Sequence, residues 1–371
     1  MRAPIALALT GFSLIAVTYG MARFSWGLML PAISAEIPFN PLQAGMLSAC
    51  SFVAYCLTIL TAAALADRYG TRLTALLASL SATAGLLLLA CASSTLLLAA
   101  GLFIAGLSAG LASPALAAAV SDRIPAAGQP RINTLTVVIL SVLPGGWRAA
   151  CLLFALLSLA CVLPVMRVLS GHAASRPTRV RHWHQRLYRR SMHRLMSIAL
   201  ISGLVSAAWW SFGSALLRQH VGVDEETTRL LWLIAGGAGI VGAATGPVAA
   251  RIGLKGVYRL SLCGMAVPLL VLAWSRGEST GLAIAVACCG AGYVTLSGVL
   301  LVWGARATAE DPATGVGILF FMLAVGQVAG SLLFGQLYAS LGASTALTLF
   351  AFSALLLLFI APAQNSSESG K

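Results

Sequence analysis

The chain has 371 residues, of which 59% are hydrophobic and only 9% are charged. Soluble domains carry about 25% charged residues, so this chain cannot build a water-facing surface and most of its exterior must face lipid. The formal net charge of +13 is compatible with nucleic-acid binding. However, the basic residues are spread over many short segments rather than gathered in one patch, so we expect no nucleic-acid partner.

Twelve apolar segments follow one another along the chain, and a helix needs about 20 apolar residues to cross a bilayer. The expected spans are 6–32, 42–65, 73–92, 95–121, 132–146, 147–168, 195–217, 229–249, 257–275, 280–304, 314–338 and 343–362. The first segment is too long for a cleavable signal core. The sequence therefore predicts an all-α, multi-pass membrane protein.

Most Lys and Arg residues fall in alternate connections between these spans. Because basic loops stay in the cytoplasm, the pattern predicts cytoplasmic N- and C-termini. The longest basic connection, 170–194, separates a first half (1–169) from a second half (195–362), and a polar tail (363–371) follows. We expect this linker to lie on anionic headgroups and the tail to be disordered. We expect no metal site and no cofactor.

A ten-residue turn occurs once in each half. Its shared residues are Arg68, Gly70 and Arg72 in the first copy and Arg251, Gly253 and Lys255 in the second. The two copies lie at a constant offset of 183 residues (251 − 68), which is close to half the chain. A repeat of this length in a membrane protein indicates a transporter built from two related halves.

The two six-span halves, the basic linker and the doubled turn together resemble the major facilitator superfamily. The family's turn reads Gly-x-x-x-Asp-(Arg/Lys)-x-Gly-x-(Arg/Lys); the first copy has Ala63 for the leading Gly and keeps Asp67, whereas the second keeps Gly246 and has Ala250 for Asp. The resemblance implies two six-helix bundles related by a pseudo-two-fold axis along the membrane normal. The stretch 19–31 resembles the first span of a bacterial branch near the cyanate-type permeases.

The doubled turn predicts a conformational latch. A carboxylate at Asp67 can cap a neighbouring helix N-terminus and favour one closed arrangement of the halves, while glycine permits the tight turn. The latch residues are Asp67, Arg68, Gly70, Arg72, Gly246, Arg251, Gly253 and Lys255. Alternatively these residues only set topology, and the two roles are not exclusive.

Arg23 is the sharpest candidate for substrate binding, because it lies inside the first span, where an arginine costs about 2.5–3.5 kcal/mol. No Asp or Glu lies in the middle of any expected span, so a small anionic substrate is a natural partner for its guanidinium. The alternative is that Arg23 snorkels to headgroups or caps backbone carbonyls. In the resembled family the first, fourth, seventh and tenth spans surround the cavity, which makes Tyr19, Trp210 and Tyr293 plausible wall residues.

Other polar and small residues indicate helix–helix contacts. Gln327 in the eleventh span and Asn133 at the start of the fifth can form hydrogen bonds across helices. Glycines at small-x-x-x-small spacing, such as Gly326 and Gly330, predict close helix packing. The lack of a buried acid weakens a cation/proton antiport interpretation, whereas proton co-binding with an anion, anion exchange or facilitated transport all fit. No phosphate-binding loop is present, so we expect no ATP drive.

The fifth span is shortened. Its 15 residues, 132–146, make a helix of about 22 Å, less than the hydrocarbon thickness of about 30 Å. The sequence thus predicts a secondary active transporter for a small anionic solute. One alternative is a degenerate, non-transporting relative, which the short fifth span suggests. The other is a small-molecule exporter, although the fifth span lacks the family's glycine-rich antiporter signature. A membrane enzyme is disfavoured, since no catalytic cluster lies near one membrane face.

Overall fold

A computed structural model describes residues 2–121, 146–169, 190–240, 245–308 and 312–360. Within these ranges every regular element is a helix, and eight helices are long and apolar enough to cross a membrane. Helical residues coincide with every expected span except the fifth, which lies outside the described residues apart from Gly146. Most of the basic linker and the tail 363–371 also lie outside them. The structure therefore confirms an all-helical, multi-pass membrane protein.

The first half begins with one continuous rod made of three helical segments. The helices of this half are α1 (Arg2–Ile15), the π-helix η1 (Ala16–Phe24), α2 (Ser25–Glu36), α3 (Pro41–Tyr69), α4 (Thr71–Ala90), α5 (Thr95–Ser121), α7 (Gly146–Ala160) and α8 (Val162–Val168). The start of α3 is fixed by a capping box, in which Asn40 and Gln43 each accept a backbone hydrogen bond from the other through their side chains,. A glycine with positive φ ends α3 and starts α4.

The second half has a similar series of helices. These are α10 (Arg190–Ala215), the π-helix η3 (Leu216–Val221), α11 (Glu225–Ala238), α12 (Thr245–Trp274), α13 (Thr280–Ala307), α14 (Pro312–Leu341), α15 (Ala343–Leu356) and the 3-10 turn η5 (Leu357–Phe359). The α12 helix is in fact two helices joined at Gly253, whose backbone is not helical. Gly253 thus separates the eighth and ninth expected spans. The α10 helix starts at Arg190, within the last residues of the expected linker.

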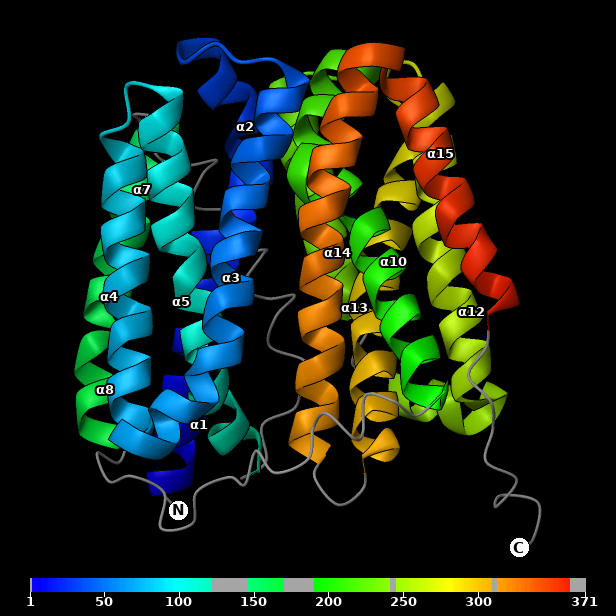
Figure 1. The fold of residues 1–371 in the computed structure, drawn as a ribbon. Coiled ribbons are helices and arrows are strands. Elements are labelled where there is room, and N and C mark those ends of the chain that lie inside the picture. The colour runs from blue at the N-terminus through cyan, green and yellow to red at the C-terminus, as the bar shows by residue number, and fades with distance from the viewer. Residues whose placement is uncertain (1, 122–145, 170–189, 241–244, 309–311, 361–371) are drawn as a thin grey trace, which may run out of the picture.

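The helices form two groups that meet along one seam (Figure 1). In the first group α5 packs on α3 and α4, and in the second α10 packs on α14 and α12 on α13. The seam is made by α3 against α14 and by α2 against α10. We call the two ends of the molecule the Glu36 end, where α2 stops, and the Gly70 end, where α3 stops.

Small residues allow these helices to approach closely. A Cβ added to Gly326 would lie 1.9 Å from the carbonyl oxygen of Leu200, and one added to Gly330 would lie 2.3 Å from that of Leu204. The predicted packing role of these two glycines is therefore confirmed. Large apolar side chains cover the outward helix faces, for example Leu156, which is 63% exposed, and Leu260, which is 62% exposed. Such surfaces are suited to lipid rather than water.

Candidate functional site

Arg23 lies at the end of a nine-residue π-helix, η1, in the middle of the first rod. It is only 8% exposed. Residues four apart lie on the same side of a helix, and the Arg23 Cζ lies 5.8 Å from the ring centre of Tyr19. Long π-helices are rare and concentrate at functional sites. The local backbone therefore directs Arg23 and Tyr19 to the same side of the rod.

The guanidinium of Arg23 is surrounded by aromatic rings and one amide. Its Cζ lies 4.1 Å from the ring centre of Tyr55, 5.0 Å from that of Phe52 and 5.4 Å from that of Phe24. Its Nη2 donates a hydrogen bond of 2.7 Å to Oε1 of Gln327. Ring faces attract a cation, but they carry no net charge. Among the described residues the hydrogen bond of Arg23 goes to a side-chain amide rather than to a backbone carbonyl.

No carboxylate among the described residues forms an ion pair with Arg23; the ion pairs found there all lie elsewhere. The Nε atom of Arg23 is buried and has no hydrogen-bond partner in that part of the chain. A positive charge in an apolar environment is costly unless it is paired. Arg23 is therefore a cation whose immediate neighbours leave its charge and one of its donors uncompensated.

Gln327 connects Arg23 to the second half. Its Nε2 donates to Oγ of Ser206 at 3.3 Å and to the hydroxyl of Tyr293 at 3.2 Å. Gln327 is 1% exposed, so the hydrogen bonds of its side-chain amide are protected from water. The prediction that Gln327 bonds across helices is confirmed, whereas the second residue predicted to do so, Asn133, lies outside the described residues.

The predicted wall residues gather on the same seam. The ring centres of Trp210 and Tyr293 are 5.4 Å apart, and those of Trp210 and Phe24 are 5.0 Å apart. Arg23 and Tyr19 thus come from η1, Trp210 from α10 and Tyr293 from α13. The structure brings all four predicted residues into one cluster that spans both halves.

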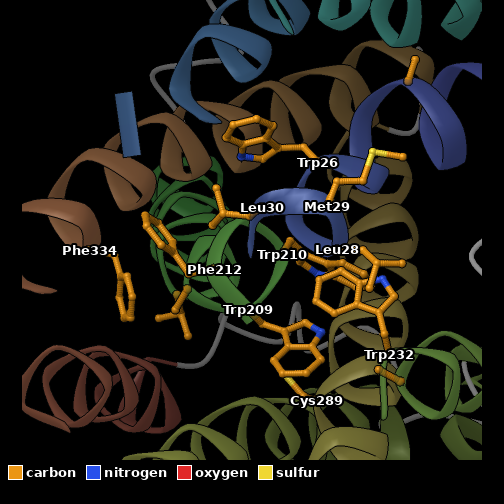
Figure 2. Close-up of a cluster of buried hydrophobic side chains, with 14 of the residues drawn as sticks. Trp26, Leu28, Met29, Leu30, Trp209, Trp210, Phe212, Trp232, Cys289 and Phe334 are labelled. Carbon is orange, nitrogen blue, oxygen red and sulfur yellow. The ribbon is translucent and has the colours of Figure 1, made fainter. Parts of the chain in front are cut away.

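Trp210 of this cluster belongs to a group of three tryptophans (Figure 2). The rings of Trp209 and Trp232 are stacked with centres 5.2 Å apart, and Trp210 meets Trp232 edge-on at 6.1 Å. Beside them is a cavity of about 10 Å³, lined by Ser206, Tyr293 and apolar side chains. That volume holds about one water molecule, and all the residues that line the cavity belong to the second half.

The halves also touch through backbone at this level. A Cβ added to Gly27 would lie 2.0 Å from the carbonyl oxygen of Trp210, and Oγ of Ser214 donates to the carbonyl oxygen of Gly27. Further toward the Glu36 end, Gly45 lies against the carbonyl oxygen of Ser331. These contacts bring the backbones of the two halves together at the Glu36 end.

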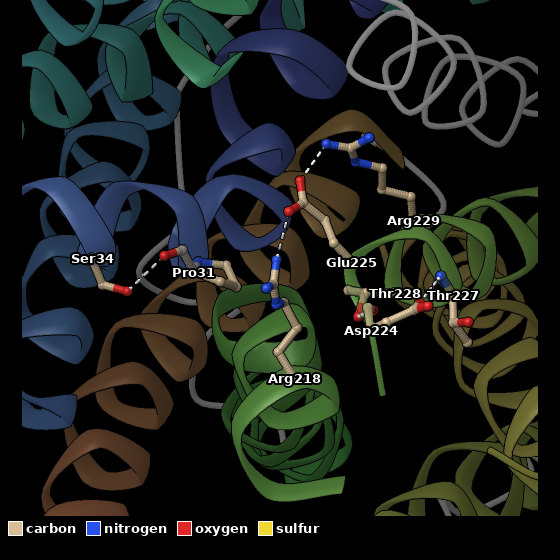
Figure 3. Close-up of polar contacts among 8 residues, drawn as sticks. All are labelled: Pro31, Ser34, Arg218, Asp224, Glu225, Thr227, Thr228 and Arg229. Atoms are coloured by element: carbon tan, nitrogen blue, oxygen red, sulfur yellow. Dashed lines mark hydrogen bonds and ion pairs between the residues drawn. The ribbon is translucent and has the colours of Figure 1, made fainter. Parts of the chain in front are cut away.

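A shallow cleft of about 170 Å³ remains at the Glu36 end between the halves. It is lined by Pro31 from the first half and by Arg218, Glu225 and Arg229 from the second. Glu225 accepts from Arg218 at 3.0 Å and also from Arg229 (Figure 3). The hydrogen bond from Arg218 and the positive charges of both arginines hold the pKa of Glu225 below its ordinary value.

The doubled turn has the backbone that its glycines predict. Gly70 has φ of 88° and Gly253 has φ of 73°, a region that residues with a side chain rarely adopt,. Arg72 Nε donates to the carbonyl oxygen of Leu169 at 2.7 Å, which ties the turn to the end of α8. Gly246 has open space around its Cα. The turn geometry is confirmed, and the latch function of the eight residues stays a prediction.

Metal-ligating residue types occur in the described part of the chain. There, no group of three or more His, Cys, Asp or Glu side chains is placed to hold a metal ion, and the cysteines are unpaired. Sequence reasoning did not single out Ser206, which accepts from Gln327, or Phe52, whose ring lies beside Arg23. Only the direction of their helix faces identifies them, and the sequence alone does not give it.

Long apolar helices in two groups, with a polar cluster buried on their seam, define a multi-pass membrane transport protein. The model of the Major Facilitator Superfamily matches residues 12–253, and the chain belongs to this superfamily. No curated protein matches the sequence. Among solved structures, a mutant form of the nucleoside transporter NupG shares the fold with a TM-score of 0.79 and 13% identity, covering 96% of this chain and 98% of that one. A second NupG structure has a TM-score of 0.71 and 14% identity, covering 97% and 98%.

Proposed function

We propose that this protein is a secondary active transporter that moves a small anionic solute across the bacterial inner membrane by alternating access. The observation that carries the proposal is Arg23, a cation buried on the seam between the halves without a carboxylate partner in the described chain. A buried cation needs negative charge nearby. An anionic solute would supply it.

The position of the cluster supports transport rather than static binding. A solute at Arg23 would contact Tyr19 from the first half and Trp210 and Tyr293 from the second. Binding energy shared between two halves can favour one of their arrangements over the other. A proton co-transported with the anion is compatible with this scheme, and the lipid bilayer is the remaining partner.

The finer architecture belongs to the same proposal. It comprises twelve spans in two six-helix bundles with a pseudo-two-fold axis, halves at 1–169 and 195–362, cytoplasmic termini, and a latch at the doubled turn. The sequence resemblance to the cyanate-type branch supports small anions as the first substrates to try. A reporter inserted at residues 145–148 tests the shortened span: an external location supports twelve spans, and a cytoplasmic one favours the non-transporting alternative.

A neutral ring-bearing solute is the second candidate. The aromatic wall of Phe24, Trp210 and Tyr293 is suited to stacking on a planar ring, and the solved structures that share the fold are of a nucleoside transporter. The uncompensated charge of Arg23 favours the anion over this candidate.

The deciding experiment is uptake of radiolabelled cyanate, acetate, benzoate and uridine into proteoliposomes. Arg23→Ala should abolish anion uptake, and Arg23→Lys should retain only part of it because lysine cannot form a two-point contact. Arg259→Ala, at an exposed arginine on α12, is the matched control and should transport normally. Anion uptake by Arg23→Ala at the wild-type rate would contradict the proposal. Uridine uptake that survives this substitution would favour the second candidate.

A further inference from the structure

On one edge of the Arg23 guanidinium, only one of the two N–H donors has a partner among the described residues. Nη2 donates to Oε1 of Gln327 at 2.7 Å, while Nε is buried and has no partner among the described residues. In arginine, the N–H of Nε and an N–H of Nη2 point along the same edge of the plane. A single amide oxygen cannot accept well from both donors.

A carboxylate matches this edge in geometry and in charge. Its two oxygens accept from two parallel N–H groups of a guanidinium in one plane. The oxygen of Gln327 occupies one of these two acceptor positions, and it does so without the negative charge. Gln327 therefore leaves one donor and the positive charge of Arg23 without a partner. This incomplete pairing suits a group that the substrate must displace.

The rings around Arg23 restrict the shape of the anion. The Cζ atom of Arg23 lies over the rings of Tyr55 and Phe52, 4.1 and 5.0 Å from their centres. A planar carboxylate can approach the edge within the guanidinium plane. A tetrahedral oxyanion can also bind at two points, but it carries a further oxygen outside that plane, which needs room beside ring faces that repel negative charge.

We infer that the side-chain oxygen of Gln327 occupies a substrate position when no substrate is bound, and we call Gln327 a stand-in in this sense. The substrate is a planar monocarboxylate, which displaces the Gln327 oxygen and accepts hydrogen bonds from both Nε and Nη2 of Arg23. This inference rests on the proposed function and narrows its substrate class. The displaced amide stays attached to the second half through Ser206 and Tyr293. Binding therefore removes a direct hydrogen bond between η1 and α14 and replaces it with contacts through the substrate.

Benzoate is the probe, because it joins a carboxylate to a ring that the aromatic wall can accept. Benzamide is its neutral analogue and phenylphosphonate its tetrahedral one. The full-length protein is purified in detergent, and binding is measured by the shift in unfolding temperature over a ligand titration. For the wild type we expect a shift with benzoate and none with benzamide or phenylphosphonate.

Substitutions at Gln327 separate a stand-in from a simple packing residue. Gln327→Glu places a carboxylate on the same edge, so it should raise the unfolding temperature without ligand and abolish the benzoate shift. Gln327→Met removes the competing oxygen and should strengthen benzoate binding about tenfold. Gln336→Met, at an exposed glutamine on the same helix, should behave like the wild type.

The outcomes distinguish this inference from the proposal on which it rests. One outcome would be that the wild type binds benzoate, Arg23→Ala does not, and both Gln327 variants bind it as the wild type does. This outcome would contradict the stand-in role of Gln327 and support the anion site at Arg23. If phenylphosphonate binds and benzoate does not, the carboxylate class is wrong. If no anion binds the wild type, both the inference and the anionic substrate are contradicted.

Discussion

Gly45 of α3 lies directly against the carbonyl oxygen of Ser331 on α14, so that an added Cβ would come within 2.3 Å of that oxygen. Farther along the seam, Gly335 of α14 lies against the carbonyl oxygen of Pro41 in the same way, with a Cβ distance of 2.6 Å. The two helix backbones meet here without a side chain between them. Closure of the Glu36 end therefore depends on residues that have no Cβ.

Gly45→Ala should open this end of the seam. The new methyl group meets backbone, which cannot rotate away, and overpacking of this kind costs about 1–3 kcal/mol. We expect solute uptake to fall. We also expect a cysteine introduced in place of Ser211 to react faster with a membrane-impermeant thiol reagent. Ser211 is buried, and its Oγ lies 3.2 Å from Oγ of Ser331.

The matched control for this prediction is Gly237→Ala in α11, where a Cβ would meet nothing within 4 Å. It should leave both uptake and thiol labelling unchanged. Equal labelling of the Gly45→Ala protein and its parent would show that the glycine contact does not hold the end shut.

The second copy of the doubled turn gives another matched pair. Gly253 has φ of 73° and ψ of 158°, a region used almost only by glycine, which costs other residues about 1–3 kcal/mol. Gly246 lies nearby with ordinary backbone and open space. We expect Gly253→Ala to lower the unfolding temperature and Gly246→Ala to keep or raise it, as measured by thermal unfolding in detergent. Similar unfolding temperatures for the two variants would contradict the need for a left-handed turn.

The sequence predicted parts of this site because charge and periodicity are local properties. Arg23 could be placed inside a span, and the lack of buried acids could be read directly from the chain. Its partner Gln327 lies 304 residues away, and which face of α14 meets η1 depends on packing along the whole seam.

The π-helix is the second reason that the site was only partly predictable. It changes the angle between successive residues, so a helical wheel drawn for an α-helix misplaces the residues of α2 relative to those of α1. Tyr19 and Arg23 are four residues apart and share a face on an α-helical wheel as well. Gly70 and Gly253, by contrast, were predictable as turn residues because their conformation follows from glycine itself.

The pH dependence of stability at the Glu36 end follows from Glu225. Its pKa is lowered, chiefly by the hydrogen bond from Arg218, so its stabilising contribution is present above the unfolded-state pKa of about 4.3. That contribution is lost as the pH falls through the lower folded-state value. The side chain is 52% exposed, so screening limits the effect to at most about 1 kcal/mol.

Glu225→Gln should therefore unfold at a slightly lower temperature than the wild type at pH 6. The difference should be lost as the pH falls through the lowered pKa of Glu225,, and it should shrink in high salt. Glu226→Gln, at the exposed neighbouring residue, is the control and should show no such difference at pH 6. A gap between Glu225→Gln and the wild type that persists at low pH would rule out the ion pair as its origin.

Tyr293 tests whether the amide of Gln327 is positioned from the second half. Its hydroxyl accepts from Nε2 of Gln327 at 3.2 Å, and its ring remains against Trp210 in a Tyr293→Phe variant. Loss of one neutral hydrogen bond costs about 0.5–1.5 kcal/mol, so we expect a change in KM of less than about tenfold with little change in expression. Tyr338→Phe, in the aromatic cluster of Phe212 and Phe334, should not change KM.

A double-mutant cycle completes this test. If Tyr293 acts only through the amide, Tyr293→Phe should have no further effect on KM once Gln327→Met has removed that amide, because the two residues then form one unit. Uptake kinetics of the two single variants and the double variant measure the coupling. Additive effects would mean that Tyr293 contacts the solute independently, as a wall residue, rather than by holding Gln327 against Arg23.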